Sequence, residues 1–130
     1  DKIRDNIELK LYNYFKKNNK PILAICRGYQ LIINFNAGTI KKIKNHVRKS
    51  HNLNVINSNF ISLRKINVNS FHNFGLFNNV NNFKKIAFHK DGSIEILEHK
   101  TKKILCVMFH PERVMKSKKN ILSDMVKFFK

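Results

Sequence analysis

The sequence is poor in cysteine, in acidic residues and in long apolar stretches, and each shortage excludes a class of protein. Two cysteines in 130 residues cannot build the disulfide framework of a small secreted domain, which favours a reducing cytoplasm. No apolar run of about 18 residues and no signal-peptide pattern is present, so neither membrane insertion nor export is expected. No internal repeat or interdomain linker divides the chain. We therefore expect a single domain over residues 1–130, located in the cytoplasm and without a membrane partner.

Acidic residues number only 8 against 26 lysines and arginines, which gives a formal net charge of +18. Such a charge would normally suggest binding to nucleic acid. The basic residues, however, are nearly all lysines spread along the chain, and their excess accompanies excesses of Asn, Ile and Phe. A genome of low G+C content explains all four excesses, because their codons are rich in A and T. We expect no specific nucleic acid partner, only weak non-specific binding with dissociation constants around 10⁻⁴ to 10⁻⁶ M.

The spacing of apolar residues predicts an α/β chain. The first helix ends at Lys17 and carries an apolar face at Ile7, Leu11 and Phe15. A helix that leads into a parallel strand predicts an earlier strand before Asp1, so the chain is expected to begin in mid-fold. The other expected elements are a strand at 22–25, a helix to about 35, a polar loop with short strand pieces at 41–59, strands at 60–63 and 66–68, a hairpin at 86–98 turning at Asp91-Gly92, and a central strand at 104–109. A last helix follows its N-cap Ser117, with five residues facing inward: Ile121, Leu122, Met125, Val126 and Phe129.

The stretch from Pro21 to Gln30 has the pattern of a nucleophile elbow. Four apolar residues lead to Cys26, Gly28 follows two positions later, and a helical pattern begins at Gln30. A tight strand-to-helix turn would place Cys26 at a helix N-terminus, where N–H groups and the helix dipole favour a thiolate. Gly28 would let the helix approach the strand closely. A lone cysteine is also commonly a small buried apolar residue, and this stretch alone leaves both interpretations open.

A second chemical motif, His110-Pro111-Glu112, follows the apolar run at 104–109. Reactive groups in open parallel sheets gather beyond the carboxyl ends of the strands, so Cys26 and His110 should lie at the same sheet edge. There Cys26 can act as nucleophile, His110 as base, and Glu112 as the group that orients the imidazole. His46 and His51 lack a second pair of ligands at zinc-finger spacing, and we expect them to be surface residues rather than metal ligands.

Five motifs taken in order resemble the class I glutamine amidotransferase-like family, and within it the γ-glutamyl hydrolase branch (peptidase C26), which includes γ-glutamyl-γ-aminobutyrate hydrolases. They are Ala24-Ile25-Cys26-Arg27-Gly28-Tyr29-Gln30, Ala37-Gly38-Thr39-Ile40, Val68-Asn69-Ser70-Phe71-His72, Asp91-Gly92-Ser93-Ile94-Glu95 and Val107-Met108-Phe109-His110-Pro111-Glu112. The resemblance implies a flavodoxin-like open sheet with flanking helices and a β-hairpin. The first strands of the family and its glycine-rich oxyanion turn have no counterpart here and would precede Asp1, so the domain is expected to be partial.

The resemblance also implies an activity, the hydrolysis of a γ-glutamyl amide. Cys26 would form the thioester, with His110 as base and Glu112 as its orienter, and glutamate would be released together with an amine or amidate. The backbone N–H of Arg27 would donate to the oxyanion. Gln30 and the turn containing Asn69, Ser70 and His72 would line the glutamyl pocket, with Asn73 on the leaving-group side.

Three departures from the family pattern stand in these motifs. Ala24 replaces a glycine of the usual Gly-x-Cys-x-Gly, Ala37 replaces the first glycine of Gly-Gly-Thr, and His72-Asn73-Phe74 stands where many relatives have His-His-Gln. Alanine at position 24 should be tolerated if its φ is negative.

Two other functions remain open from the sequence. One is a glutaminase subunit that delivers ammonia to a synthase, and the other is an inactive truncated remnant or a basic binding protein. No cofactor or metal is expected. The expected partners are a small-molecule γ-glutamyl substrate and either a second copy of the chain or an N-terminal segment that pairs with the open sheet edge.

Overall fold

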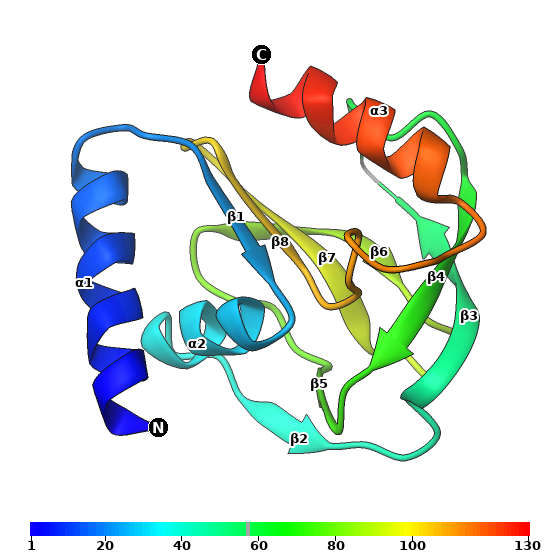
Figure 1. Cartoon of the computed structure of the whole chain (residues 1–130), viewed down its shortest axis with the longest axis horizontal. Helices are drawn as coiled ribbons and strands as arrows, with labels where there is room; N and C mark the ends of the chain where they lie inside the picture. Colours follow the sequence, from blue (N-terminus) through cyan, green and yellow to red (C-terminus); the bar gives the residue numbers. More distant parts are fainter. Residues whose placement is uncertain (57) are drawn as a thin grey trace.

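The computed structural model describes residues 1–56 and 58–130 and shows one open, curled sheet with helices on both faces (Figure 1). The helices are α1 (Lys2–Lys17), α2 (Arg27–Phe35) and α3 (Lys118–Phe129). The strands are β1 (Ile22–Ile25), β2 (Ile40–Lys42), β3 (Val47–Val55), β4 (Lys65–Phe71), β5 (Phe74–Leu76), β6 (Phe83–Phe88), β7 (Ile94–His99) and β8 (Ile104–Val107). The flavodoxin-like architecture expected from the sequence is confirmed.

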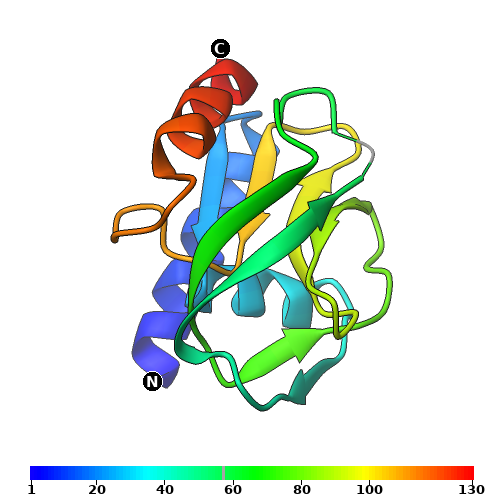
Figure 2. The same ribbon diagram turned by 90° about the vertical axis from the view of Figure 1, so that its right-hand side faces the viewer.

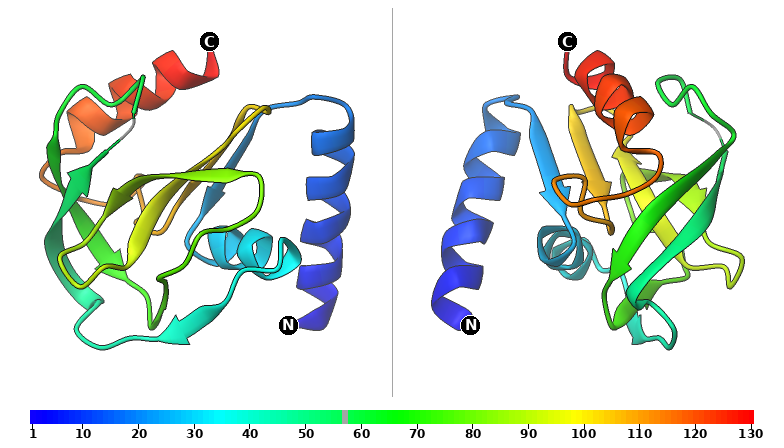
Figure 3. Two further views of the ribbon diagram at one scale, coloured as in Figure 1. Left: turned by 180° about the vertical axis from the view of Figure 1, so that it is seen from behind. Right: turned by 45° about the vertical axis from the view of Figure 1, so that its right-hand side comes forward.

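The described strands follow the order β1-β8-β7-β6-β3-β4, and β5 joins β2 to β7 beside this path. The pair β1–β8 is parallel, whereas β8–β7, β7–β6, β6–β3 and β3–β4 are antiparallel. Figures 2 and 3 show β3 and β4 curling away from the central strands, with the chain termini at opposite ends of the molecule. The expected hairpin is confirmed: β6 and β7 turn through Asp91-Gly92, and Gly92 has the positive φ of 91° that such a turn requires.

Strand β8 separates two apolar cores, because successive side chains of a strand point to opposite faces. Ile104, Cys106 and Met108 belong to the core beneath α1 and α2. Leu105, Val107 and Phe109 belong to the core beneath α3, which β3 and β4 close with Leu53, Ile66 and Val68. The continuous apolar run at 104–109 therefore reflects a strand that is buried on both faces.

Three expectations about these elements are wrong. The segment 41–59 contains the nine-residue strand β3 rather than a loop with short strand pieces, and Asn57 within it lies outside the described residues. Residues 60–63 form no strand. In α3, Leu122 and Val126 are exposed, while Asp124 and Phe128 are buried in their place. Asp124 can be buried because its carboxylate accepts hydrogen bonds from the backbone and hydroxyl of Ser62.

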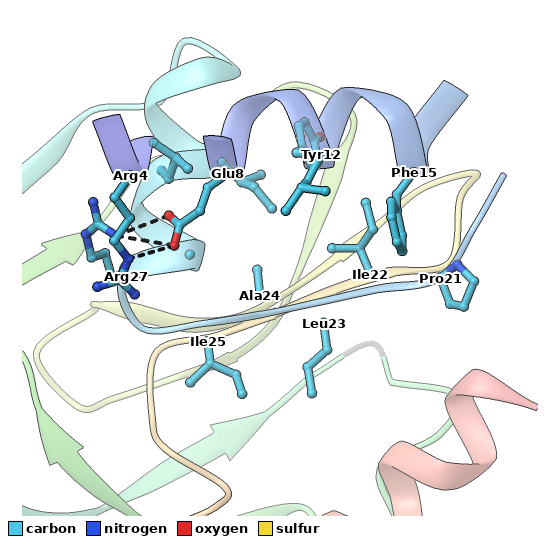
Figure 4. Close-up of a pocket in the computed structure, with 14 residues that line it drawn as sticks. Arg4, Glu8, Tyr12, Phe15, Pro21, Ile22, Leu23, Ala24, Ile25 and Arg27 are labelled. Atoms are coloured by element: carbon cyan, nitrogen blue, oxygen red, sulfur yellow. Dashed lines mark hydrogen bonds and ion pairs between the residues drawn. The ribbon is translucent and has the colours of Figure 1, made fainter. Parts of the chain in front are cut away.

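A groove lies between α1, β1 and α2, with a volume of about 430 Å³ (Figure 4). Ile22 and Ala24 point from β1 toward α1, whereas Leu23 and Ile25 point to the other face of the sheet. The apolar face expected on α1 is only partly covered, since Ile7 and Leu11 remain exposed. Among the described strands, β1 pairs with β8 and has no partner on its other edge. Within residues 1–56 and 58–130, no helix combines the length and apolar character needed to cross a membrane.

Candidate active site

Cys26 occupies the turn between β1 and α2, as the elbow pattern predicts. Its backbone N–H donates to the carbonyl of Val107 at 2.8 Å, which extends the β1–β8 pairing by one bond. Its carbonyl accepts from the N–H of Gln30 at 3.0 Å, the first hydrogen bond of α2. Its backbone has φ 50° and ψ −96°, a conformation that residues with a Cβ rarely adopt. This strained turn lifts Cys26 off the end of the strand, as nucleophile elbows do.

The helix N-terminus lowers the pKa of the Cys26 thiol, as expected, but this effect is smaller than that of burial. Burial raises the pKa of the Cys26 thiol above its ordinary value, and this outweighs the lowering by the backbone N–H of Arg27 and by the charge of Arg113. Cys26 is therefore a thiol at neutral pH and needs a base to remove its proton when it reacts.

We predict that alkylation distinguishes the two thiols. Iodoacetamide should modify Cys26, which is partly exposed, well before Cys106, which is fully buried. Because the pKa of Cys26 is raised, its rate of modification should keep climbing as the pH passes about 8.5, the usual thiol pKa. Peptide mass spectrometry across pH 7 to 10 measures both rates. Equal rates for the two thiols, or a plateau for Cys26 below pH 8, would contradict this assignment.

His110 lies at the same sheet edge as Cys26. The parallel register pairs Ile25 with Val107, so Cys26 comes one residue after the end of β1 and His110 comes three residues after the end of β8. The Nδ1 atom of His110 lies 2.8 Å from Oε2 of Glu112. Slight burial would raise the pKa of Glu112, but its own backbone N–H and the neighbouring His110 and Arg113 hold that pKa below its usual value. An ionised Glu112 accepts the proton of Nδ1, which leaves Nε2 of His110 available as a base.

Asn69 on β4 holds the backbone of the loop after β8, which carries His110. Its Oδ1 accepts the N–H of His110 at 2.9 Å, and its Nδ2 donates to the carbonyls of His110 at 2.8 Å and Val114 at 3.2 Å. Its amide therefore has three partners within the protein. Ser70, fully buried, donates its hydroxyl to the carbonyl of His46 at 2.5 Å. Both side chains therefore form hydrogen bonds to the protein backbone, whereas the sequence led us to expect contact with substrate.

Arg27 and Gln30 both lie in the first turn of α2, directly after Cys26. The guanidinium of Arg27 points to α1, where it pairs with Glu8 at 3.2 Å and contacts Asp5, so its backbone N–H is the part that faces Cys26. The Nε2 of Gln30 lies 3.6 Å from the sulfur of Met108, next to the exit of β8. The groove of Figure 4 is lined by Arg27 but not by Cys26, His110 or Glu112.

His72 and Asn73 follow β4, and their side chains lie in different surroundings. His72 is buried and its ring faces Glu95, while Asn73 is exposed on the turn toward β5. Asn73 is therefore the residue of this turn that can reach a ligand in solvent.

The expectation that His46 and His51 are surface residues is wrong. The side chain of His46 is 2% exposed and that of His51 is 8% exposed. Together with His72 they surround the buried carboxylate of Glu95, and His89 packs against His46 and His51. The ring centroid of His46 lies 4.9 to 5.1 Å from those of the other three histidines. Sequence spacing could not reveal this cluster, because its members come from four separated segments.

Arg113 is a further residue that the motif analysis missed. Its guanidinium carbon lies 4.5 Å above the ring of Phe71, and that ring in turn packs edge-on against His110 at 5.9 Å. The cation is close enough to Cys26 to lower the thiol pKa. A planar guanidinium at this place can bind a carboxylate of an incoming ligand.

The chain is similar to several known proteins. The family described as Peptidase C26 matches residues 1–112. A γ-glutamyl-CDP-amidate hydrolase of Campylobacter jejuni is 33% identical over 112 residues, covering 86% of this chain and 52% of the relative. A glutamine amidotransferase-like protein of Lactococcus lactis is 33% identical over 129 residues, covering 86% of this chain and 54% of the relative.

A solved structure from Thermoplasma acidophilum, described as a GMP synthase subunit, superposes with a TM-score of 0.79 at 25% identity. The superposition covers 94% of this chain and 63% of that protein. The chain thus spans about half the length of the curated relatives it matches.

Proposed function

Since this chain belongs to the peptidase C26 family, we propose that it hydrolyses γ-glutamyl amides through a thioester on Cys26. The observation that carries the proposal is the arrangement at one sheet edge: an elbow cysteine after β1, and after the adjacent parallel strand a histidine whose Nδ1 is 2.8 Å from a carboxylate. This is the nucleophile, base and orienter set of covalent acyl transfer. The 33% identical γ-glutamyl-CDP-amidate hydrolase supports a γ-glutamyl substrate.

The proposed reaction has two steps. In the first, Nε2 of His110 takes the proton of Cys26, the sulfur attacks the γ-carbonyl, and the tetrahedral oxyanion accepts the backbone N–H of Arg27. His110 then returns the proton to the departing nitrogen, which leaves a γ-glutamyl thioester. In the second step, His110 deprotonates a water that attacks the thioester, and glutamate and the Cys26 thiol are released.

We propose that the residues around this centre divide into binding and positioning groups. Gln30 beside Met108 and exposed Asn73 line the substrate pocket, and Asn73 lies on the leaving-group side. Arg113 is placed to pair with the glutamyl carboxylate. Asn69 and Ser70 position the loop and the β4–β5 turn through their bonds to backbone carbonyls.

A second candidate is a glutaminase that passes ammonia to a synthase. It is supported by the TM-score of 0.79 to the Thermoplasma acidophilum protein, whose description is that of a GMP synthase component. The two candidates share the thioester and differ in the leaving group, which is ammonia for the glutaminase and a larger amine or amidate for the hydrolase.

The discriminating experiment compares kcat/KM for glutamine with kcat/KM for γ-glutamyl amides of larger amines. It uses the natural full-length protein without added partners. Contacts to the larger amine should act in the transition state, so we expect the larger amides to react faster, and Asn73→Ala to reduce that preference. The control is Asn13→Ala, which removes an exposed amide on α1. Glutamine as the best substrate, with no effect of Asn73→Ala, would establish the glutaminase instead.

A further inference from the structure

The histidine cluster contains polar atoms for which the fold provides no partner. Glu95 on β7 is 0% exposed. Its Oε2 lies 3.5 Å from Nδ1 of His46, 2.8 Å from Nε2 of His51 and 3.6 Å from Nε2 of His72. Within residues 1–56 and 58–130, none of these four atoms makes a hydrogen bond of acceptable geometry. Buried polar atoms are almost always paired, so four orphans at one point require an explanation.

In His46 and His72, one ring nitrogen bonds to a group outside the cluster. This bond determines which nitrogen of the neutral ring carries the proton, and the other nitrogen faces Glu95 without one. Nδ1 of His72 lies 2.8 Å from the carbonyl of Phe74, and a carbonyl can only accept, so Nδ1 carries the proton. Nε2 of His46 lies 2.7 Å from Oδ2 of Asp91 and donates to it in the same way. In the neutral rings, Nδ1 of His46 and Nε2 of His72 therefore direct lone pairs at Glu95. Two lone pairs and a carboxylate that converge repel one another unless a positive charge lies between them.

The distances distinguish a metal ion from protons. A proton on either nitrogen would draw it to within about 3.2 Å of the carboxylate oxygen, as N–H···O bonds require. The observed separations of 3.5 and 3.6 Å are longer. Ligands of a tetrahedral zinc ion, at about 2.0 to 2.1 Å from the metal, lie roughly 3.3 Å from each other. One donor atom each from His46, His72 and Glu95 lies within 4.8 Å of the others, and all three residues are buried.

We propose that His46, His72 and Glu95 bind a zinc ion. Two imidazoles and one carboxylate match the preference of Zn²⁺ for nitrogen and oxygen donors, and they leave the fourth position of a tetrahedral site to a water molecule. Asp91 and the carbonyl of Phe74 hold the outer nitrogens of two ligands, as supporting groups do around protein-bound zinc.

The surface above the cluster supplies a route for the ion and favours this type of metal. A cavity of about 400 Å³ is lined by His46, His51 and His89, so one of the ligands, His46, can be reached from solvent. Lys44, Lys49 and Lys90 also line it. Their charges repel weakly held cations, and one carboxylate is too few oxygens for Ca²⁺ or Mg²⁺. Only a metal that gains strongly from imidazole coordination would bind here.

The ion would join three segments: the loop before β3, the turn after β4, and β7. The turn after β4 carries Asn73, so the ion would fix the base of the proposed substrate pocket without contacting the reacting atoms. The zinc site stands on the cluster geometry and does not depend on the proposed hydrolase activity.

The test is the zinc content of the untagged chain. The protein is stripped with a chelator, reloaded with excess Zn²⁺ at pH 7.5, desalted and analysed for metal, and its thermal midpoint is recorded with and without the ion. We expect about one zinc per chain and a rise of several degrees, since an ion that binds only the folded state stabilises it. Co²⁺ in place of Zn²⁺ should give the visible absorption of a four-coordinate centre. An unchanged midpoint and no retained metal would overturn the proposal.

Variants locate the ion. Glu95→Gln and His46→Asn should lose the bound zinc, whereas Glu98→Gln, on the same strand but paired with Lys84 at 3.9 Å, should retain it. Asp91→Asn leaves all three ligands in place and should weaken zinc affinity about 10- to 100-fold. If Glu95→Gln fails to fold, the zinc content of the unaltered chain and the zinc affinity of Asp91→Asn still test the proposal. Zinc retained equally by His46→Asn and Glu98→Gln would show that the metal binds elsewhere, and would refute the site.

Discussion

Replacing Cys26 with alanine should lower kcat/KM for γ-glutamyl amide hydrolysis by about 10⁴- to 10⁶-fold, the loss typical of removing the nucleophile of a covalent mechanism. The fold should survive, because alanine keeps the Cβ and faces the same strained φ of 50° as the cysteine. The folded protein should therefore be present in normal amount and be inactive. The measurement is kcat/KM together with thermal unfolding, on the natural full-length protein.

The matched control is Cys106→Ala. Cys106 is fully buried in the core beneath α1 and α2, and burial raises the pKa of its thiol far above the usual value. Its replacement should leave kcat unchanged and lower the free energy of unfolding by about 1 kcal/mol, as small core truncations do. Activity that survives in Cys26→Ala, or disappears in Cys106→Ala, would contradict the thioester on Cys26.

The second large effect is expected at Asn69, whose amide holds the backbone of His110 on both sides. Asn69→Ala should lower kcat by about 10²-fold, because a displacement of the base by about 1 Å has that consequence. KM should change little if Asn69 positions His110, and should rise if the amide binds substrate instead. The split between kcat and KM therefore separates the two roles.

Asn67→Ala is the control for this experiment. Asn67 lies on the same strand and donates its amide to Asn52 at 2.9 Å, on the exposed side of the hairpin. Its replacement removes a side-chain hydrogen bond from β4 without touching the loop after β8, so kcat should be unchanged. Equal losses in Asn67→Ala and Asn69→Ala would indicate a general weakening of β4 rather than a role at His110.

The position of Cys26 and His110 at one sheet edge was predictable from local sequence pattern and the fold class. An apolar run that ends at Cys26, and another that ends at His110, both report the carboxyl ends of buried strands. Parallel pairing then brings the two ends together, and this pairing follows from the fold class. The pKa of Cys26 could not be predicted in the same way, since it depends on burial that only the packed structure defines.

The backbone conformation shows how the chain accommodates the positions where alanine replaces a glycine of the family pattern. Ala24 is not among the described residues with positive φ, so the alanine is tolerated there as expected. A Cβ on Gly28 would lie at an ordinary contact distance of 3.6 Å from the Cβ of Ala24, so this glycine is not required for close packing. Ala37, in contrast, has a φ of 60°, which explains why glycine is usual at this position of the family.

The histidine cluster and β3 were not predictable, for one common reason. Strand β3 is rich in Lys, Asn and His and mostly exposed, so it lacks the apolar alternation that reveals a strand. Without that strand, nothing in the sequence brings His51 to Glu95, which is 44 positions later (95 − 51) and lies on β7. Polar residues that are brought together only by the pairing of distant strands cannot be predicted from local sequence pattern.

Arg27 connects helix α1 to the turn that holds Cys26. Its amide lies beside the nucleophile, while its guanidinium is fastened to Asp5 and Glu8 on α1. These ion pairs are partly exposed, so added electrolyte screens them and loosens α1 from the turn. We therefore expect ionic strength to change how firmly α1 holds the backbone of Arg27, the proposed oxyanion donor.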